Sequence, residues 1–117
     1  MRIDVSNLGA ATVVRPADER IDIEVAGDLR AELLRLIESG RANLVVDLEG
    51  VSFIDSSGLG ALVSGIKAIR TSGVGGDIRL ANSRASVIEL LQVIRLNRVF
   101  STYPSVELAA QSFGEGR

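Results

Sequence analysis

The chain has 117 residues, of which 46% are hydrophobic and 24% are charged, and its formal net charge is −2. This composition is typical of one globular domain, and the weak acidity with three Phe, one Tyr and no Trp argues against nucleic-acid binding, which needs basic and aromatic surface. The absence of cysteine and histidine excludes disulfides, thiol nucleophiles, imidazole bases and the commonest metal ligand.

The first residues predict a β-hairpin. Residues 2–5 alternate apolar and polar side chains, as a half-buried strand does, and residues 11–15 form a second run rich in β-branched side chains. Residues 7–9 supply the turn between the two strands, and residues 16–19 end the hairpin.

A helix is predicted after the hairpin. Residues 20–23 read as a short extended piece or as the lead into this helix, which runs to Ser39. Gly40 suits the position just after a helix end, because glycine adopts the left-handed conformation at little cost. The apolar residues that fall on one face of the helix are Leu29, Leu33, Leu36 and Ile37.

In the centre of the sequence, a predicted strand is followed by a predicted helix. Residues 44–48 predict the strand, and residues 59–70 continue the helix with an apolar stripe. Between them, Asp55, Ser56, Ser57 and Gly58 are placed at the helix N-terminus. Several small residues in this helix predict that another element approaches it closely.

Further strands and helices follow towards the C-terminus. Residues 71–76 predict a flexible connector and residues 77–81 a strand. Ser86 and Glu89 have the spacing of a capping box, which predicts a third helix that starts near Ser86.

The end of the chain predicts one more strand and one more helix. Residues 98–103 read as the strand, and Pro104 followed by Ser105 reads as a stop followed by an N-cap. The terminal helix is then expected over residues 106–113, and residues 114–117 are expected to fray.

This order of elements predicts an α/β fold in a single domain over residues 1–117. Strands and helices alternate from the third strand onward, which implies parallel pairing, and the hairpin adds one antiparallel edge. The longest uncharged central run, residues 56–66, is too short to cross a bilayer, and residues 1–5 lack the apolar core of a secretory signal. We therefore expect a cytoplasmic protein without direct membrane insertion.

The central Asp55-Ser56-Ser57 segment has two interpretations. Asp and Ser are preferred N-caps, so helix capping alone explains one of these residues. Three adjacent candidates exceed what one cap needs, and they follow the end of a strand, where α/β proteins bind ligands. The positive end of a helix favours phosphate, so we hypothesise that Ser56 receives one.

Ser56 lacks the partners of a catalytic nucleophile. No histidine is available as a base, and the only lysine, Lys67, lies eleven residues further along the helix, roughly 16 Å away. Asp22, Asp47 and Asp55 have no spacing that forces them to converge on Mg²⁺, so solvated acids are the simpler interpretation. We predict no enzymatic activity, no catalytic residue, no metal site and no cofactor.

Residues 45–60, VVDLEGVSFIDSSGLG, resemble the STAS domain family, and specifically the stand-alone anti-sigma-factor antagonists of bacteria. GGDIRL at 75–80 and RLNRVF at 95–100 support this, and the resemblance covers nearly the whole chain. It implies one STAS-like domain, with a mixed sheet of about five strands and about four helices mainly on one face. The chain departs from the family in a slightly long loop at 72–76 and in the lack of a glycine just before Asp22.

The resemblance also implies a switch. In the family a serine kinase, often doubling as the anti-sigma factor, phosphorylates the first serine after the aspartate, which is Ser56 here. The unphosphorylated antagonist binds that partner, the phosphorylated form is released, and a PP2C-type serine phosphatase resets it. The family also places an acid matching Asp22 near the phosphorylated serine. The residues we expect to contact the partner are Asp22, Asp55, Ser56, Ser57, Gly58 and Leu59.

A second function stays open at this point. Some STAS domains are accessory subunits of lipid transport systems or regulatory parts of anion transporters. In such a protein the domain is an interaction module, and the serine can be unused.

Overall fold

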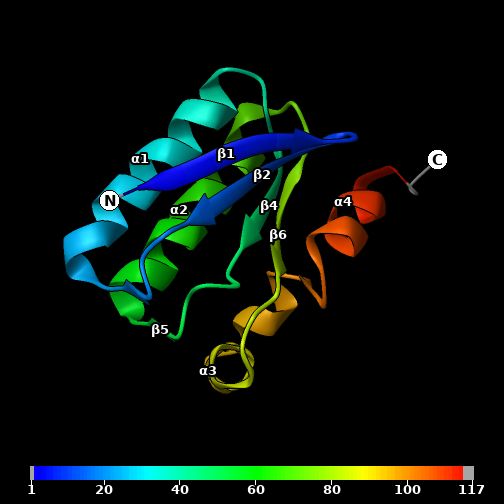
Figure 1. The fold of residues 1–117 in the computed structure, drawn as a ribbon. Helices are drawn as coiled ribbons and strands as arrows, with labels where there is room; N and C mark the ends of the chain where they lie inside the picture. Colours follow the sequence, from blue (N-terminus) through cyan, green and yellow to red (C-terminus); the bar gives the residue numbers. More distant parts are fainter. Residues whose placement is uncertain (1, 115–117) are drawn as a thin grey trace.

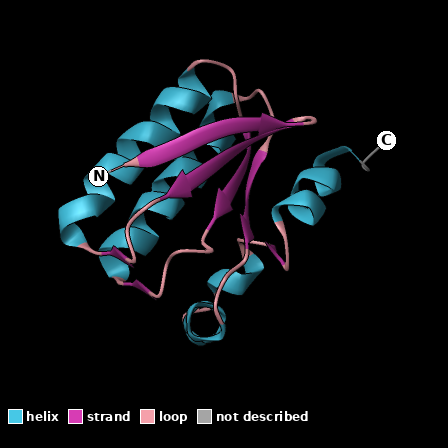
Figure 2. Ribbon diagram, viewed as in Figure 1, coloured by secondary structure: helices cyan, strands magenta, loops and turns pink. Residues whose placement is uncertain are grey.

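A computed structural model of the protein describes residues 2–114 (Figures 1 and 2). The elements in chain order are β1 Ile3–Leu8, β2 Ala11–Pro16, β3 Arg20–Ile21, α1 Ile23–Glu38, β4 Asn43–Asp47, β5 Phe53–Ile54, α2 Ser56–Ser72, β6 Asp77–Ala81, α3 Ala85–Val93, the 3₁₀-helix η1 Leu96–Arg98, β7 Thr102–Tyr103 and α4 Val106–Gly114. Of the tail predicted at residues 114–117, Gly114 is the last residue of α4, and residues 115–117 lie outside the described part of the chain.

The main sheet has five strands in the order β1-β2-β4-β6-β7. β1 and β2 are antiparallel, with Leu8 opposite Ala11 across the turn, and the remaining neighbours are parallel. The predicted α/β fold with one antiparallel edge is therefore confirmed. A second, two-stranded parallel sheet joins β3 to β5 and was not predicted.

Alternating side chains divide the main sheet into two faces. On β4 and β6, Leu44 and Ile78 point into the large core, which also contains apolar residues of α1, α2 and α3. Val45 and Ala81 point to the other face, where α4 packs. Figure 1 shows α1 and α2 side by side on one side of the sheet and α4 on the other. The helices thus lie mainly on one face.

α2 packs closely against the sheet because it carries glycine where it meets β6. A Cβ atom on Gly65 would lie 2.6 Å from the Ile78 Cδ1 atom and 3.4 Å from the Leu33 Cδ1 atom. The first distance is too short for a real Cβ contact, so a side chain at position 65 would push α2 away from β6, whereas the distance to Leu33 of α1 is close to ordinary van der Waals contact. The close approach predicted from the small residues of this helix is confirmed.

α4 is attached to the sheet by apolar side chains, of which only two alanines are fully buried, and by one arginine. Ala109 and Ala110 are buried on the α4 side. The Arg79 guanidinium of β6 donates to the Ser112 hydroxyl at 2.6 Å, lies 4.0 Å from the Phe113 ring centre and pairs with Asp77 at 3.1 Å. One side chain of the sheet therefore contacts two residues of α4.

Near the C-terminus, the predicted helix start close to Ser86 is confirmed, because α3 begins at Ala85. The capping box is wrong, since the N-cap is Arg84 and makes no side-chain cap. Residues 98–101 are not a strand, because η1 covers part of them and β7 pairs with β6 only through Thr102 and Tyr103. The predicted N-cap of α4 is confirmed, since the Ser105 hydroxyl accepts from the Leu108 N–H at 3.1 Å.

Candidate functional site

The candidate site lies where two short strands lead into two helices. β3 and β5 pair in parallel, with Arg20 opposite Phe53 and Ile21 opposite Ile54. β3 is followed by α1 and β5 by α2, and the Asp55 N–H donates to the Ile21 carbonyl at 3.2 Å. The ladder therefore sets the N-termini of α1 and α2 next to each other, as the family resemblance implied for Asp22 and Ser56, although no local sequence pattern indicated it.

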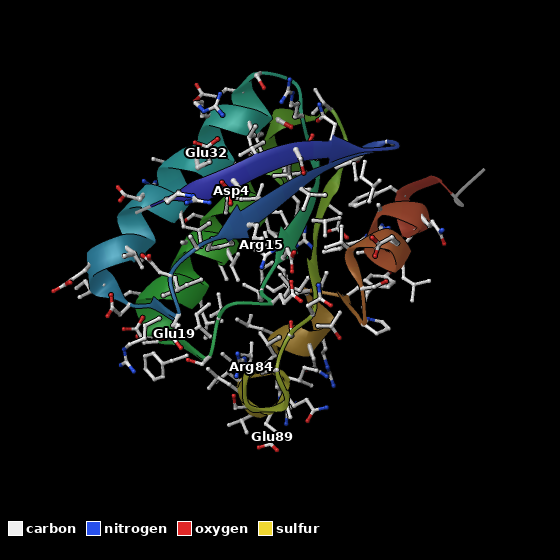
Figure 3. The ribbon with its side chains drawn as sticks, in the orientation of Figure 1. Asp4, Arg15, Glu19, Glu32, Arg84 and Glu89 are labelled. Carbon is white, nitrogen blue, oxygen red and sulfur yellow. The ribbon has the colours of Figure 1, made fainter. Side chains whose placement is uncertain are left out.

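The loop before β3 fixes the other end of this ladder. Glu19, labelled in Figure 3, accepts through its backbone carbonyl from the Ser52 N–H at 2.8 Å and the Phe53 N–H at 3.2 Å. Because both strands are only two residues long, these backbone bonds extend a ladder that would otherwise be too short to hold its register.

An aspartate caps each of the two helices. Asp22 accepts from the Glu24 N–H at 3.0 Å. Asp55 accepts from two N–H groups, those of Ser57 at 2.9 Å and Gly58 at 3.1 Å. Each cap satisfies donors that the first helical turn leaves without partners. The two acids that were predicted at the site are thus brought together, both as helix caps.

Ser56 occupies the first position of α2 and is exposed. Within residues 2–114 its hydroxyl takes part in no hydrogen bond, and the neighbouring Ser57 is half-buried. Of the two adjacent serines, Ser56 is therefore the one whose oxygen an enzyme reaches more easily.

Gly58 and Leu59 face inward. A Cβ atom on Gly58 would lie 2.6 Å from the Ile54 Cγ1 atom and 2.7 Å from the Ile21 carbonyl oxygen. Leu59 is 6% exposed and belongs to the large core. Both residues therefore seat the first turn of α2 against β3 and β5.

Two large apolar side chains at this end are exposed, and sequence analysis did not select them. Ile23, the first residue of α1, is 77% exposed, and Phe53 of β5 is 39% exposed beneath the Arg20 guanidinium, which lies 4.1 Å from the ring centre. The signal for Ile23 is that it directly follows the cap Asp22, ahead of the residues that form the buried stripe of α1.

A family profile described as STAS domain matches residues 2–109. The chain belongs to the STAS domain family. Over 94 residues, which span 80% of this STAS chain and 78% of the relative, it is 33% identical to the anti-sigma-B factor antagonist of Bacillus subtilis. The aligned region thus covers most of both proteins.

Solved STAS-like structures share this fold. The anti-sigma-factor antagonist (STAS) domain protein of Planctomyces limnophilus is 27% identical with a TM-score of 0.81, over 94% of this chain and 95% of that one. The murine anion transporter Slc26a9 is 22% identical with a TM-score of 0.66, over 96% of this chain but 19% of the transporter. The second likeness is one of fold alone.

The third acid considered from the sequence, Asp47, lies apart from the two caps. It is buried at the end of β4, where it accepts from the Asn82 amide at 2.9 Å and the Glu49 N–H at 3.1 Å. Among residues 2–114 of this STAS domain, no group of three or more acidic, histidine or cysteine side chains is arranged to hold a metal ion.

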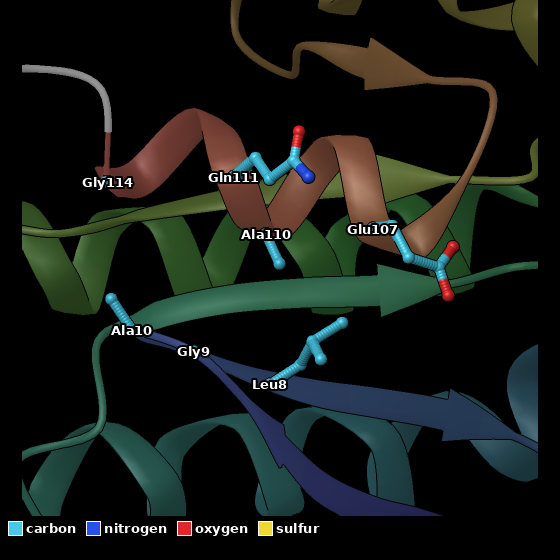
Figure 4. Close-up of a pocket in the computed structure, with 7 residues that line it drawn as sticks. All are labelled: Leu8, Gly9, Ala10, Glu107, Ala110, Gln111 and Gly114. Atoms are coloured by element: carbon cyan, nitrogen blue, oxygen red, sulfur yellow. The ribbon is translucent and has the colours of Figure 1, made fainter.

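A mainly apolar cavity of about 400 Å³ lies on the α4 side of the STAS sheet (Figure 4). It is formed by the β1–β2 turn and one side of α4, and its lining residues are Leu8, Gly9, Ala10, Glu107, Ala110, Gln111 and Gly114. Because α2 packs on the opposite face, this cavity is separate from Ser56. In the described part of the chain, no helix has the length and apolarity of a membrane span.

Proposed function

We propose that this STAS domain is a phosphorylation-switched anti-sigma-factor antagonist and that Ser56 is the residue phosphorylated. The observation that supports Ser56 as the phosphorylated residue is that its hydroxyl is exposed at the first position of α2, because a kinase must reach the oxygen that it modifies. The curated relative, itself an anti-sigma-factor antagonist, supports the choice of function.

The proposed switch involves two partner proteins, a kinase and a phosphatase. Unphosphorylated, the domain binds a serine kinase that is also an anti-sigma factor, and the sigma factor is set free. Phosphorylated, the domain is released, and a PP2C-type serine phosphatase returns it to the binding form. The chain itself is bound and modified, so the proposal assigns it no catalytic step.

The fold should tolerate the phosphate. Asp55 already accepts from two N–H groups of the first turn, so α2 is capped whether or not Ser56 is modified. A negative group at a helix N-terminus also interacts favourably with the helix dipole. We therefore expect the modification to act on the partner and to leave the domain folded.

The release has an electrostatic origin. Residues 18–24 and 52–57 together contain five acidic side chains and one basic one. A phosphate adds about −1.5 to −2 charges to this acidic end. If it meets an acidic or apolar surface, the unfavourable contact amounts to several kcal/mol, and every 1.4 kcal/mol weakens binding about tenfold. A release of roughly a thousandfold then needs no change of fold.

The predicted contact residues take different parts in this proposal. In this proposal Ser56 and Ser57 touch the partner, and the carboxylates of Asp22 and Asp55, which cap the two helices, lie beside them. Gly58 and Leu59 are buried and act through the position of the first turn.

The transporter alternative receives less support. The likeness to the anion transporter is one of fold, and the chain matches a small part of that protein. The relative at 33% identity is an antagonist and is matched over most of its length. The proposal therefore rests on the antagonist.

Phosphate mapping tests the site. The chain is used to capture its kinase from source cells in the presence of ADP, the kinase is identified and purified, and the two proteins are then incubated with ATP. Mass spectrometry is expected to find one phosphate on Ser56, also in the Ser57→Ala variant. A phosphate on Ser57, or none on the chain, would refute the assignment.

Binding of two variants tests the switch. Ser56→Ala should bind the purified kinase about as tightly as the unmodified chain, and Ser56→Asp should bind more weakly, because it places a negative charge in the contact. Titration calorimetry with ADP measures both affinities. Equal affinities for the two variants would show that charge at this position does not control binding.

A further inference from the structure

Two of the large apolar side chains that are exposed in residues 2–114 lie close to Ser56. Ile23 is 77% exposed at the first position of α1, and Phe53 is 39% exposed on β5. Single exposed apolar residues are common on proteins and by themselves indicate nothing. These two, however, flank the one residue of the chain for which a modification is proposed.

The paired strands place Ile23 beside Ser56. Ile21 is opposite Ile54 in the β3–β5 ladder, each strand is followed by a capping aspartate, and each aspartate by the first helical residue. Ile23 and Ser56 are those first residues. Packed helices lie about 8–10 Å apart, so a protein that covers Ser56 also covers Ile23.

Phe53 is held in place on the other strand of the ladder. The Arg20 guanidinium lies 4.1 Å from its ring centre and keeps one face of the ring covered. Next to Phe53, a shallow and mainly apolar hollow of about 260 Å³ lies between β5 and α3. The residues that line it are Ser52, Phe53, Ile54, Ser86, Val87 and Leu90.

The domain itself makes little use of the Ile23 side chain. The cap of α1 is supplied by Asp22, and its core contacts are made by residues from Val25 onward. Isoleucine is also a weaker helix former than alanine or leucine. A water-exposed isoleucine at this position therefore has no evident role in stability.

We propose that Ile23 and Phe53 form the apolar anchor by which the kinase/anti-sigma factor binds this domain, an inference that rests on the function proposed above. The acidic side chains around the anchor define the chemistry of the partner surface: an apolar pocket for Ile23, bordered by lysine or arginine side chains that face residues such as Asp22 and Glu24. Interfaces of this type have an apolar centre and a charged rim.

The anchor also explains why a phosphate on Ser56 would release the partner despite that basic rim. The phosphate would stand beside the centre of the contact, where Ile23 and Phe53 exclude water. A doubly charged group in an apolar contact loses its hydration without gaining a partner, which strongly disfavours the bound state.

One matched pair of variants tests the anchor. Ile23→Ser removes the apolar side chain next to Ser56, and Val74→Ser removes one that is 67% exposed at the far end of α2. Titration of each variant with the purified kinase and ADP gives the affinity. Ile23→Ser is expected to bind about 10- to 100-fold more weakly, the effect of losing one buried aliphatic side chain, and Val74→Ser within about twofold of the unmodified chain.

Three controls separate the possible results. Ile23→Leu should restore most of the affinity, and thermal unfolding should show that Ile23→Ser remains folded, because the side chain makes few internal contacts. If the unmodified chain binds and is phosphorylated on Ser56 while Ile23→Ser binds equally well, the anchor is wrong and the proposed function stands. If no kinase binds or modifies the unmodified chain, the proposed function fails first.

Discussion

The N-termini of α1 and α2 share one local architecture but differ in two side chains. Both follow strands of the same two-residue ladder, and both have an aspartate as N-cap. The first helical residue is Ile23 in α1 and Ser56 in α2, and the third is the half-buried Val25 in α1 and the buried Gly58 in α2.

The differences show that the start of α2 is the more tightly fixed of the two. Asp55 accepts from two N–H groups and Asp22 from one. Gly58 lets α2 approach the β3 backbone within a distance that leaves no room for a Cβ atom. Because the start of α2 is rigidly held, the Ser56 hydroxyl, which makes no hydrogen bond within residues 2–114, has a well-defined position. A well-defined position favours recognition of this residue by a modifying enzyme.

The largest expected effect comes from Gly58→Ala. The new Cβ atom would lie 2.7 Å from the Ile21 carbonyl oxygen and 2.6 Å from the Ile54 side chain, so α2 or β3 must shift. We expect a loss of about 1–3 kcal/mol in the free energy of unfolding, measured by urea denaturation. Unchanged stability would show that the first turn of α2 is free to move.

The next effect distinguishes the two caps. Asp55→Ala should lower the free energy of unfolding by about 1–2 kcal/mol and Asp22→Ala by about 0.5–1 kcal/mol, because cap removal falls in this range and Asp55 caps two donors. Asp55→Asn should lose little, since asparagine also caps helices. A larger loss for Asp22→Ala than for Asp55→Ala would contradict the ranking.

Gly60→Ala should have a smaller effect of the opposite sign. No atom lies within 4 Å of the position that an added Cβ would take, and Gly60, the fifth residue of α2, is exposed. Alanine is favoured over glycine in a helix by up to about 1 kcal/mol, so the midpoint of thermal unfolding should rise. A fall would mean that Gly60, like Gly58, is needed for close packing.

The smallest expected effect is that of Ser56→Ala on stability. The side chain is exposed and its hydroxyl is unbonded within residues 2–114, so the free energy of unfolding should change by less than about 0.5 kcal/mol. Urea denaturation of the purified variant measures this. A loss comparable to that of Asp55→Ala would mean that the serine serves the helix and is not kept for a partner.

Local patterns were sufficient for most of the main sheet and for the long helices. The apolar run of Leu44, Val45 and Val46 predicted β4, and Gly40 predicted the end of α1. Asp55 and Ser56 were placed at the start of α2 for the same reason, since capping is decided by neighbouring residues.

The parts that escaped prediction depend on contacts distant in the sequence. β3 and β5 are two residues each, too short for any periodicity, and their pairing brings residues 20–21 and 53–54 together. Ser86 and Glu89 had the capping-box spacing and predicted the helix start closely, but the N-cap is Arg84 and no side chain caps α3. The exposure of Ile23 also depends on how α1 packs against the rest of the fold.

The attachment of α4 has a consequence for the motions of this domain. The fully buried residues of α4 are two alanines, Val106 and Phe113 are only partly buried against the sheet, and Arg79 of β6 contacts the helix through Ser112 and Phe113. Lifting such a helix off the sheet exposes few carbon atoms compared with separating α1 from α2. Amide hydrogens of α4 should therefore exchange with solvent through local opening, well before those of the central helices, which require the whole core to come apart.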